Sequence, residues 1–282
     1  MLRTLQAKDF AAVPYLETSQ LMTHHQGVVS FSLDKPNVII GPNGSGKSAL
    51  LTSMALRFLT YYFPRSSLDH HYIDTFRNSG IWTEGHDKKT YARVALYLPG
   101  LVVDTDSAPA VYYRPNHLPG NEPDIAHAML TGYFEEAREF GNLTDKKSSG
   151  EQCRALLQSL VKVLQGKNLP KEYLAVNWRH GREVREVSRT SYVGDIPYRV
   201  NALLELTRFK RGALPLVMMD EPEQSLDTLG EMQLWEHIAK ANCSKMQLVV
   251  ATHSLYPLVH PEKFNIIESV PGYMQQVLEL FK

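Results

Sequence analysis

Three runs of apolar residues organise the sequence, and each ends at a glycine or at polar side chains. They are Val38–Ile40, Leu214–Met219 and Met246–Ala251. Runs without polar alternation are typical of parallel strands that are buried on both faces of a sheet. Apolar residues at helical spacing occur at Lys47–Tyr62, Ile125–Phe140, Glu151–Leu164, Tyr198–Phe209 and Gly230–Ala241. Strands that alternate with helices predict an α/β fold with a mostly parallel sheet flanked by helices.

The other segments fit one domain with additions. Further strands are expected at Leu2–Leu5, Val28–Leu33, Tyr91–Leu98, Leu101–Val103 and Val111–Tyr113. We expect residues 1–282 to form a single domain in which 63–147 contributes β and helical insertions. The polar stretch 166–197 is expected to be an inserted arm.

Charge and composition exclude several classes of protein. The 30 basic and 30 acidic residues give a formal net charge of zero, so the chain is no uniformly basic nucleic-acid coat. Its 2 cysteines fit a reducing compartment. No apolar run approaches the ~20 residues that span a bilayer, and the first residues lack the apolar core of a signal peptide. We expect a soluble, cytoplasmic protein without a membrane partner.

A glycine-rich segment follows the first apolar run. Residues 41–48 read GPNGSGKS, a complete G-x-x-x-x-G-K-S pattern. Glycines let successive backbone N–H groups surround a polyphosphate, and the next helix directs its positive end at the same anion. Lys47 then reaches the β- and γ-phosphates, and the Ser48 hydroxyl is a ligand for Mg²⁺. The expected nucleotide-binding residues are Asn43, Gly44, Ser45, Gly46, Lys47 and Ser48.

The other two apolar runs end in side chains suited to phosphate chemistry. Leu214–Met219 leads into Asp220 and Glu221, and Met246–Ala251 leads into His253 after one threonine. We expect Asp220 to hold Mg²⁺, and Glu221 to orient or deprotonate an attacking water. His253 would contact the γ-phosphate or that water, because ligands bind at the carboxyl ends of parallel strands. Lys47, Glu221 and His253 are therefore the candidate catalytic residues.

In this order, GPNGSGKS, MMDEPEQSLD and ATHS resemble the ABC-type ATPases over most of the chain. Within that family, these motifs are most similar to those of the SMC, RecF and OLD-like branch. Glu223 in the DEPE segment and the opening strand also resemble that branch. The resemblance implies a P-loop ATPase head that includes an antiparallel β subdomain and a helical subdomain. It also implies ATP and Mg²⁺ as ligands, and head-to-tail homodimers, or higher oligomers, that enclose two ATP molecules.

In that family a signature segment of one subunit contacts the nucleotide of another. Residues 148–152 match its chemistry, with Ser149, Gly150 and Gln152 at the start of a helix, whereas 191–195 have the better spacing before Asp220. We favour 148–152, with 191–195 as the alternative. Asp227 matches the family's D-loop, which crosses the dimer interface.

Two features bear on the choice of function. Transporter subunits carry a coupling glutamine, but no Gln occurs between residues 27 and 151, where Asn116 and His117 are the replacement candidates. The chain also lacks sustained heptads for a coiled-coil arm. We expect an ATP-hydrolysing switch that acts in DNA repair or phage defence with DNA or a separate nuclease or toxin. The alternatives are a transporter nucleotide-binding subunit and an adaptor that binds ATP without turnover.

Direct DNA contact would need a local basic patch. Residues 177–189 carry Trp178 among Arg179, Arg182, Arg185 and Arg189. Arginine binds phosphate oxygens and tryptophan stacks on bases. This segment is the expected site for non-specific DNA.

Overall fold

The fold is described from a computed structural model of the chain. The structure describes residues 1–8, 13, 15–58, 61–62, 101–105, 110–113, 148–167, 169, 213–224, 226–280 and 282. Its strands are β1 (Leu2–Ala7), β2 (Val28–Ser30), β3 (Asn37–Ile40), β4 (Tyr61–Tyr62), β5 (Leu101–Thr105), β6 (Ala110–Tyr113), β7 (Leu216–Asp220), β8 (Gln247–Ala251) and β9 (Asn265–Glu268). Its helices are α1 (Gln20–His24), α2 (Lys47–Arg57), α7 (Ser149–Leu164), α11 (Thr228–Ala239), α12 (Tyr256–Val259), the 3₁₀ helix η3 (Pro261–Lys263) and α13 (Tyr273–Glu279).

Two sheets form the framework of the described residues. The larger has six strands in the order β4-β6-β7-β8-β3-β9, and every neighbouring pair is parallel. The smaller has three antiparallel strands in the order β2-β1-β5. The predicted α/β class and mostly parallel sheet are confirmed, and a separate antiparallel sheet is present.

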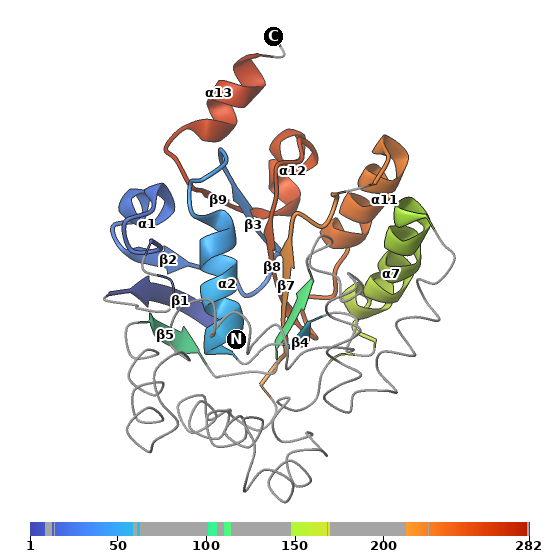
Figure 1. Cartoon of the computed structure of the whole chain (residues 1–282), viewed down its shortest axis with the longest axis horizontal. Helices are drawn as coiled ribbons and strands as arrows, with labels where there is room; N and C mark the ends of the chain where they lie inside the picture. Colours follow the sequence, from blue (N-terminus) through green and yellow to red (C-terminus); the bar gives the residue numbers. More distant parts are fainter. Residues whose placement is uncertain are drawn as a thin grey trace, which may run out of the picture.

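Alternating residues of the parallel strands divide the core into two layers. Ile39, Met218 and Val249 belong to the cluster that includes α2 and the antiparallel sheet. Their strand neighbours face the opposite way, into a cluster built with α7, α11 and α12. Helices therefore cover both faces of the parallel sheet (Figure 1). Because both faces are covered, β3, β7 and β8 are buried at every position.

Some element boundaries differ from the sequence predictions. The helix expected at Lys47–Tyr62 ends at Arg57, and Tyr61–Tyr62 forms β4 beside β6. The strand β6, which lies within the expected insertion 63–147, pairs with β7 in the parallel sheet. Those residues are therefore part of the sheet itself. The strand expected at 91–98, the helices expected at 125–140 and 198–209, and nearly all of the arm 166–197 lie outside the described residues.

Candidate functional site

A glycine-rich loop joins the end of β3 to the start of α2. Gly41 and Gly46 have φ angles of 149° and 108°. Residues that carry a Cβ rarely adopt this backbone conformation. A Cβ at Gly46 would lie 2.6 Å from the Cβ of Ser19, and one at Gly41 would collide with the hydroxyl of Ser269. Both the backbone conformation and the close packing therefore require glycine at these two positions.

The loop is held from two sides through Ser45. Its backbone oxygen accepts a hydrogen bond from the Leu21 N–H at 2.9 Å, and its hydroxyl accepts one from Ser269 Oγ at 2.7 Å. Ser45 and Ser269 are fully buried. The loop is thus fixed between α1 and the end of β9, so its N–H groups are organised before any ligand arrives.

Lys47 folds back over this loop. Its Nζ donates to the backbone oxygens of Gly41 at 2.8 Å and Pro42 at 3.0 Å. Burial lowers the pKa of the ammonium, and the charges of Glu221 and Asp220 oppose that shift. An anion bound in the loop would compensate a cation that has lost much of its hydration.

Asp220 ends β7 beside the start of α2 and is almost fully buried. Ser48 Oγ donates to its Oδ1 at 3.0 Å, and Tyr112 Oη donates to its Oδ2 at 3.0 Å. A hydroxyl and a carboxylate suit Mg²⁺, which usually takes one or two protein oxygens and completes its shell with water and phosphate. Among the described residues no three His, Cys, Asp or Glu side chains form a metal-binding cluster. The two residues therefore fit a magnesium ion that a phosphate ligand helps to bind, and not a site built of protein ligands alone.

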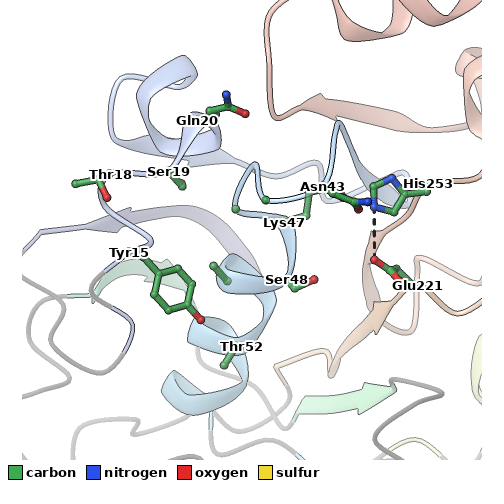
Figure 2. Close-up of a pocket in the computed structure, with 13 residues that line it drawn as sticks. Tyr15, Thr18, Ser19, Gln20, Asn43, Lys47, Ser48, Thr52, Glu221 and His253 are labelled. Atoms are coloured by element: carbon green, nitrogen blue, oxygen red, sulfur yellow. Dashed lines mark ion pairs between the residues drawn. The ribbon is translucent and has the colours of Figure 1, made fainter.

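Glu221 and His253 face each other where β7 and β8 end. His253 Nε2 lies 3.5 Å from Glu221 Oε1 (Figure 2). Glu221 has a φ of 47°, and its N–H donates to Ala251 O at 2.8 Å. A left-handed conformation in a non-glycine residue is costly and occurs often at functional sites. Burial, and next the charge of Lys47, lower the pKa of His253, so the neutral imidazole is favoured.

Glu223 lies behind this pair. Its Oε1 accepts hydrogen bonds from the Thr252 hydroxyl and, at 3.2 Å, from the His253 N–H. Its Oε2 is buried and has no hydrogen-bond partner among the described residues. Burial raises the pKa of this carboxyl, which favours its protonated form. The sequence indicated Glu223 only through the family resemblance and gave it no role.

A cavity of about 700 Å³ is lined by the glycine-rich loop, by Lys47 and Ser48, and by Glu221 and His253. Figure 2 shows Tyr15, Thr18 and Ser19 on one side of the glycine-rich loop, and Glu221 and His253 on the other. The first side was not predicted as part of the site, although Ser19 carries a signal. It is the N-cap of α1, where its side chain accepts from Met22 N, and serine before a short apolar pattern is a common helix start.

The structure brings together most of the predicted residues. Those that line the cavity are Asn43, Gly44, Gly46, Lys47, Ser48, Glu221 and His253, and Asp220 and Ser45 lie directly behind them. Of the proposed signature and D-loop, Ser148, Glu151 and Asp227 are not among the described residues that line it, and the side chains of Ser149, Gly150 and Gln152 lie outside the description. Ser148 caps α7, and Asp227 caps α11 and binds Arg154 of α7 at 2.5 Å. The alternative signature 191–195, Asn116, His117 and the basic segment 177–189 lie outside the described residues.

Comparison with known proteins assigns no family. No protein-family model matches the sequence, and a search of curated proteins finds no match either. None of the described helices combines the length and the apolar composition needed to cross a membrane.

Proposed function

We propose that this protein binds and hydrolyses ATP as a switch of the ABC type, closest to the SMC, RecF and OLD-like branch. One observation carries the proposal. The loop with Lys47 and Ser48 shares a cavity of about 700 Å³ with Glu221 and His253, and Asp220 adjoins Ser48. A glycine-rich turn alone would be weak evidence, but acid and imidazole groups from two other strands meet it here.

The residues divide the work by position. The loop N–H groups and Lys47 would bind the phosphates, while Ser48 and Asp220 would hold Mg²⁺. The ion would neutralise phosphate charge as the leaving group departs. Tyr15 and Thr18 line the cavity on the side of the loop away from Glu221, where the nucleoside would lie.

Glu221 would orient a water molecule and accept its proton. The water oxygen bonds to the γ-phosphorus while the bond from that phosphorus to the bridging oxygen breaks, which gives ADP and phosphate. His253, 3.5 Å from Glu221, would contact the γ-phosphate or the water. Its lowered pKa keeps it largely neutral near pH 7, so its ring has one donor and one acceptor nitrogen.

We propose that ATP hydrolysis controls the action of a partner molecule. We propose ATP-dependent homodimers that act with a separate nuclease or toxin, or with DNA, in repair or defence. The transporter alternative has the sequence against it, since its coupling glutamine is missing. The adaptor alternative predicts a lost catalytic carboxylate, whereas Glu221 is present and faces the cavity.

The decisive experiment separates ATP binding from turnover. Lys47→Ala should abolish binding measured by calorimetry, because the phosphates lose their buried cation. Glu221→Gln should keep binding but slow phosphate release about 10²–10⁴-fold, since only the proton acceptor changes. Lys162→Ala and Glu279→Gln, both at exposed positions, serve as controls. Wild-type protein that fails to bind ATP would refute the proposal, and full turnover in Glu221→Gln would remove that residue from catalysis.

A further inference from the structure

We propose that Glu223 is a positioning residue that holds His253 opposite Glu221 through its bonds to Thr252 and the His253 N–H. The inference rests on the proposed function, because it assigns a role within the same site. Glu223 itself does not line the cavity, so it would act through its neighbours.

The contacts join two turns that follow different strands. Glu223 belongs to the turn after β7, in which Gln224 N donates to Glu221 O at 3.0 Å. Thr252 follows β8 and is fully buried. Its hydroxyl donates to Glu223 Oε1 and accepts from Ser254 N at 2.8 Å. The Glu223 carboxyl therefore fixes the backbone on both sides of His253.

A second link connects the same two turns. The Glu221 N–H donates to Ala251 O, while Glu221 adopts its left-handed conformation. The turns are thus joined at Glu221 by the backbone and at Glu223 by a side chain. The 3.5 Å approach of Glu221 Oε1 and His253 Nε2 lies just beyond these two links. If the Glu223 link is removed, Thr252 N still donates to Ile39 O at 3.1 Å and Ser254 still binds Glu231, but the His253 N–H loses its acceptor and the side chain can turn away from Glu221.

Both hydrogen bonds that position the turn are accepted by Oε1, so the role of Glu223 needs an acceptor oxygen at this place and not a negative charge. Burial and the charge of the nearby Glu231 raise the pKa of the Glu223 carboxyl, and within the part of the chain that the structure describes its Oε2 has no hydrogen-bond partner. A neutral acid keeps Oε1 as an acceptor and adds no negative charge beside Glu221. Glutamine has the same shape, carries no charge and offers the same acceptor oxygen.

The kcat values of variants at Glu223 and Thr252 test this role. Glu223→Gln should keep kcat within about threefold of wild type. Glu223→Ala should lower kcat by about 10–100-fold with a nearly unchanged KM for ATP, because a displacement of about 1 Å in a catalytic group costs that much. Thr252→Val should also lower kcat, because valine lacks the hydroxyl that donates to Glu223. Thr252→Ser keeps that hydroxyl and should have a kcat close to that of wild type. If Glu223→Ala does not fold, the two Thr252 variants test the same hydrogen bond.

A measurement without nucleotide tests the same point. The imidazole of His253 can be titrated by NMR, with its signal assigned from a His253→Asn variant. In Glu223→Ala the ring should become more hydrated and its pKa should rise towards the ordinary histidine value, while Glu223→Gln should leave it in place. Glu262→Ala is the matched control, since this exposed glutamate lies 3.9 Å from a different histidine, His260.

The two proposals can fail separately. Wild-type protein that does not hydrolyse ATP would refute the proposed function, and the His253 titration would still decide the role of Glu223. A His253 pKa that is unchanged in Glu223→Ala would overturn the positioning role even if ATP is hydrolysed. Equal losses of kcat in Glu223→Gln and Glu223→Ala would overturn it as well.

Discussion

At the scale of single residues, Asp220 shows how one carboxylate is oriented by donors from two elements. Ser48 from α2 binds Oδ1, and Tyr112 from β6 binds Oδ2. The two hydroxyls fix the plane of the carboxylate. Because Tyr112 binds Oδ2, Oδ1 stays directed at the Ser48 hydroxyl. A metal ion would be bound between Oδ1 and that hydroxyl. Hydrogen bonds of this kind around metal ligands commonly alter metal affinity 10–100-fold.

Tyr112→Phe tests this arrangement. The change removes one hydroxyl and little volume, so Asp220 should keep its place but lose its fixed orientation. We expect the Mg²⁺ concentration for half-maximal ATP hydrolysis to rise about tenfold, measured as phosphate release over a magnesium titration. Tyr113→Phe is the control, because this tyrosine is equally buried but belongs to the core on the other face of the sheet. An unchanged magnesium dependence in Tyr112→Phe would show that the hydroxyl has no such role.

The individual site residues differ in how well the sequence predicts them. Lys47 and Ser48 lie in a local motif, and the ends of two apolar strands indicated Asp220, Glu221 and His253. Tyr112 and Thr252 carry no such signal, since their roles depend on pairing between strands that are distant in the chain. Tyr112 becomes relevant only because β6 lies beside β7 in register, with Tyr112 opposite Met218.

At the scale of elements, Gln247 joins the two sheets. It is the first residue of β8 and is almost fully buried. Its Oε1 accepts from Leu2 N at 2.6 Å, and its Nε2 donates to Leu2 O at 2.7 Å and to Ser32 O at 3.1 Å. The start of β1 and the chain after β2 are thereby fixed to the parallel sheet.

Gln247→Met should therefore destabilise the fold. Methionine has a similar length but cannot make these bonds, and the buried backbone groups of Leu2 would lose this partner. We expect a loss of about 2–4 kcal/mol in the free energy of unfolding, measured by urea denaturation. Gln275→Met on α13, whose partner Glu279 is an exposed contact, should change stability by less than about 0.5 kcal/mol. Equal stability of the Gln247→Met variant and wild type would show that the sheets are held together by apolar packing alone.

The length of an element decided whether the sequence revealed it. The strands β3, β7 and β8 were predicted because parallel strands covered on both faces are continuous apolar runs. The four-residue helix α12 and the two-residue strand β4 are too short to show a period. The helix α2 was predicted to continue to Tyr62, because the apolar pattern continues after the residue where the helix ends.

At the scale of the whole molecule, the helix that begins at the proposed signature and the helix that begins at the cavity belong to different layers. The helix α2 packs in the core on one face of the parallel sheet, and α7 packs in the core on the other face. Arg154 of α7 binds Asp227 at the start of α11, so the helix that begins with the proposed signature is joined to the proposed D-loop residue. Neither Arg154 nor Asp227 is among the described residues that line the cavity. Asp227 would therefore meet a nucleotide only if a second subunit supplied it, and the resemblance implies the same for Ser149.

ATP-dependent self-association tests that arrangement. Glu221→Gln should hold ATP without turnover, so light scattering after size exclusion should show a larger species when ATP and Mg²⁺ are added. Ser149→Arg in that background should prevent the shift, because a long cation at the start of α7 would obstruct the approach of a second loop. Ser244→Arg, at an exposed turn, is the matched control and should associate normally.

If Ser149→Arg still associates while a bulky residue at Gly194 blocks the shift, the signature is 191–195. If Glu221→Gln binds ATP and remains a monomer, the proposed dimer is wrong, and the switch must act as a single chain.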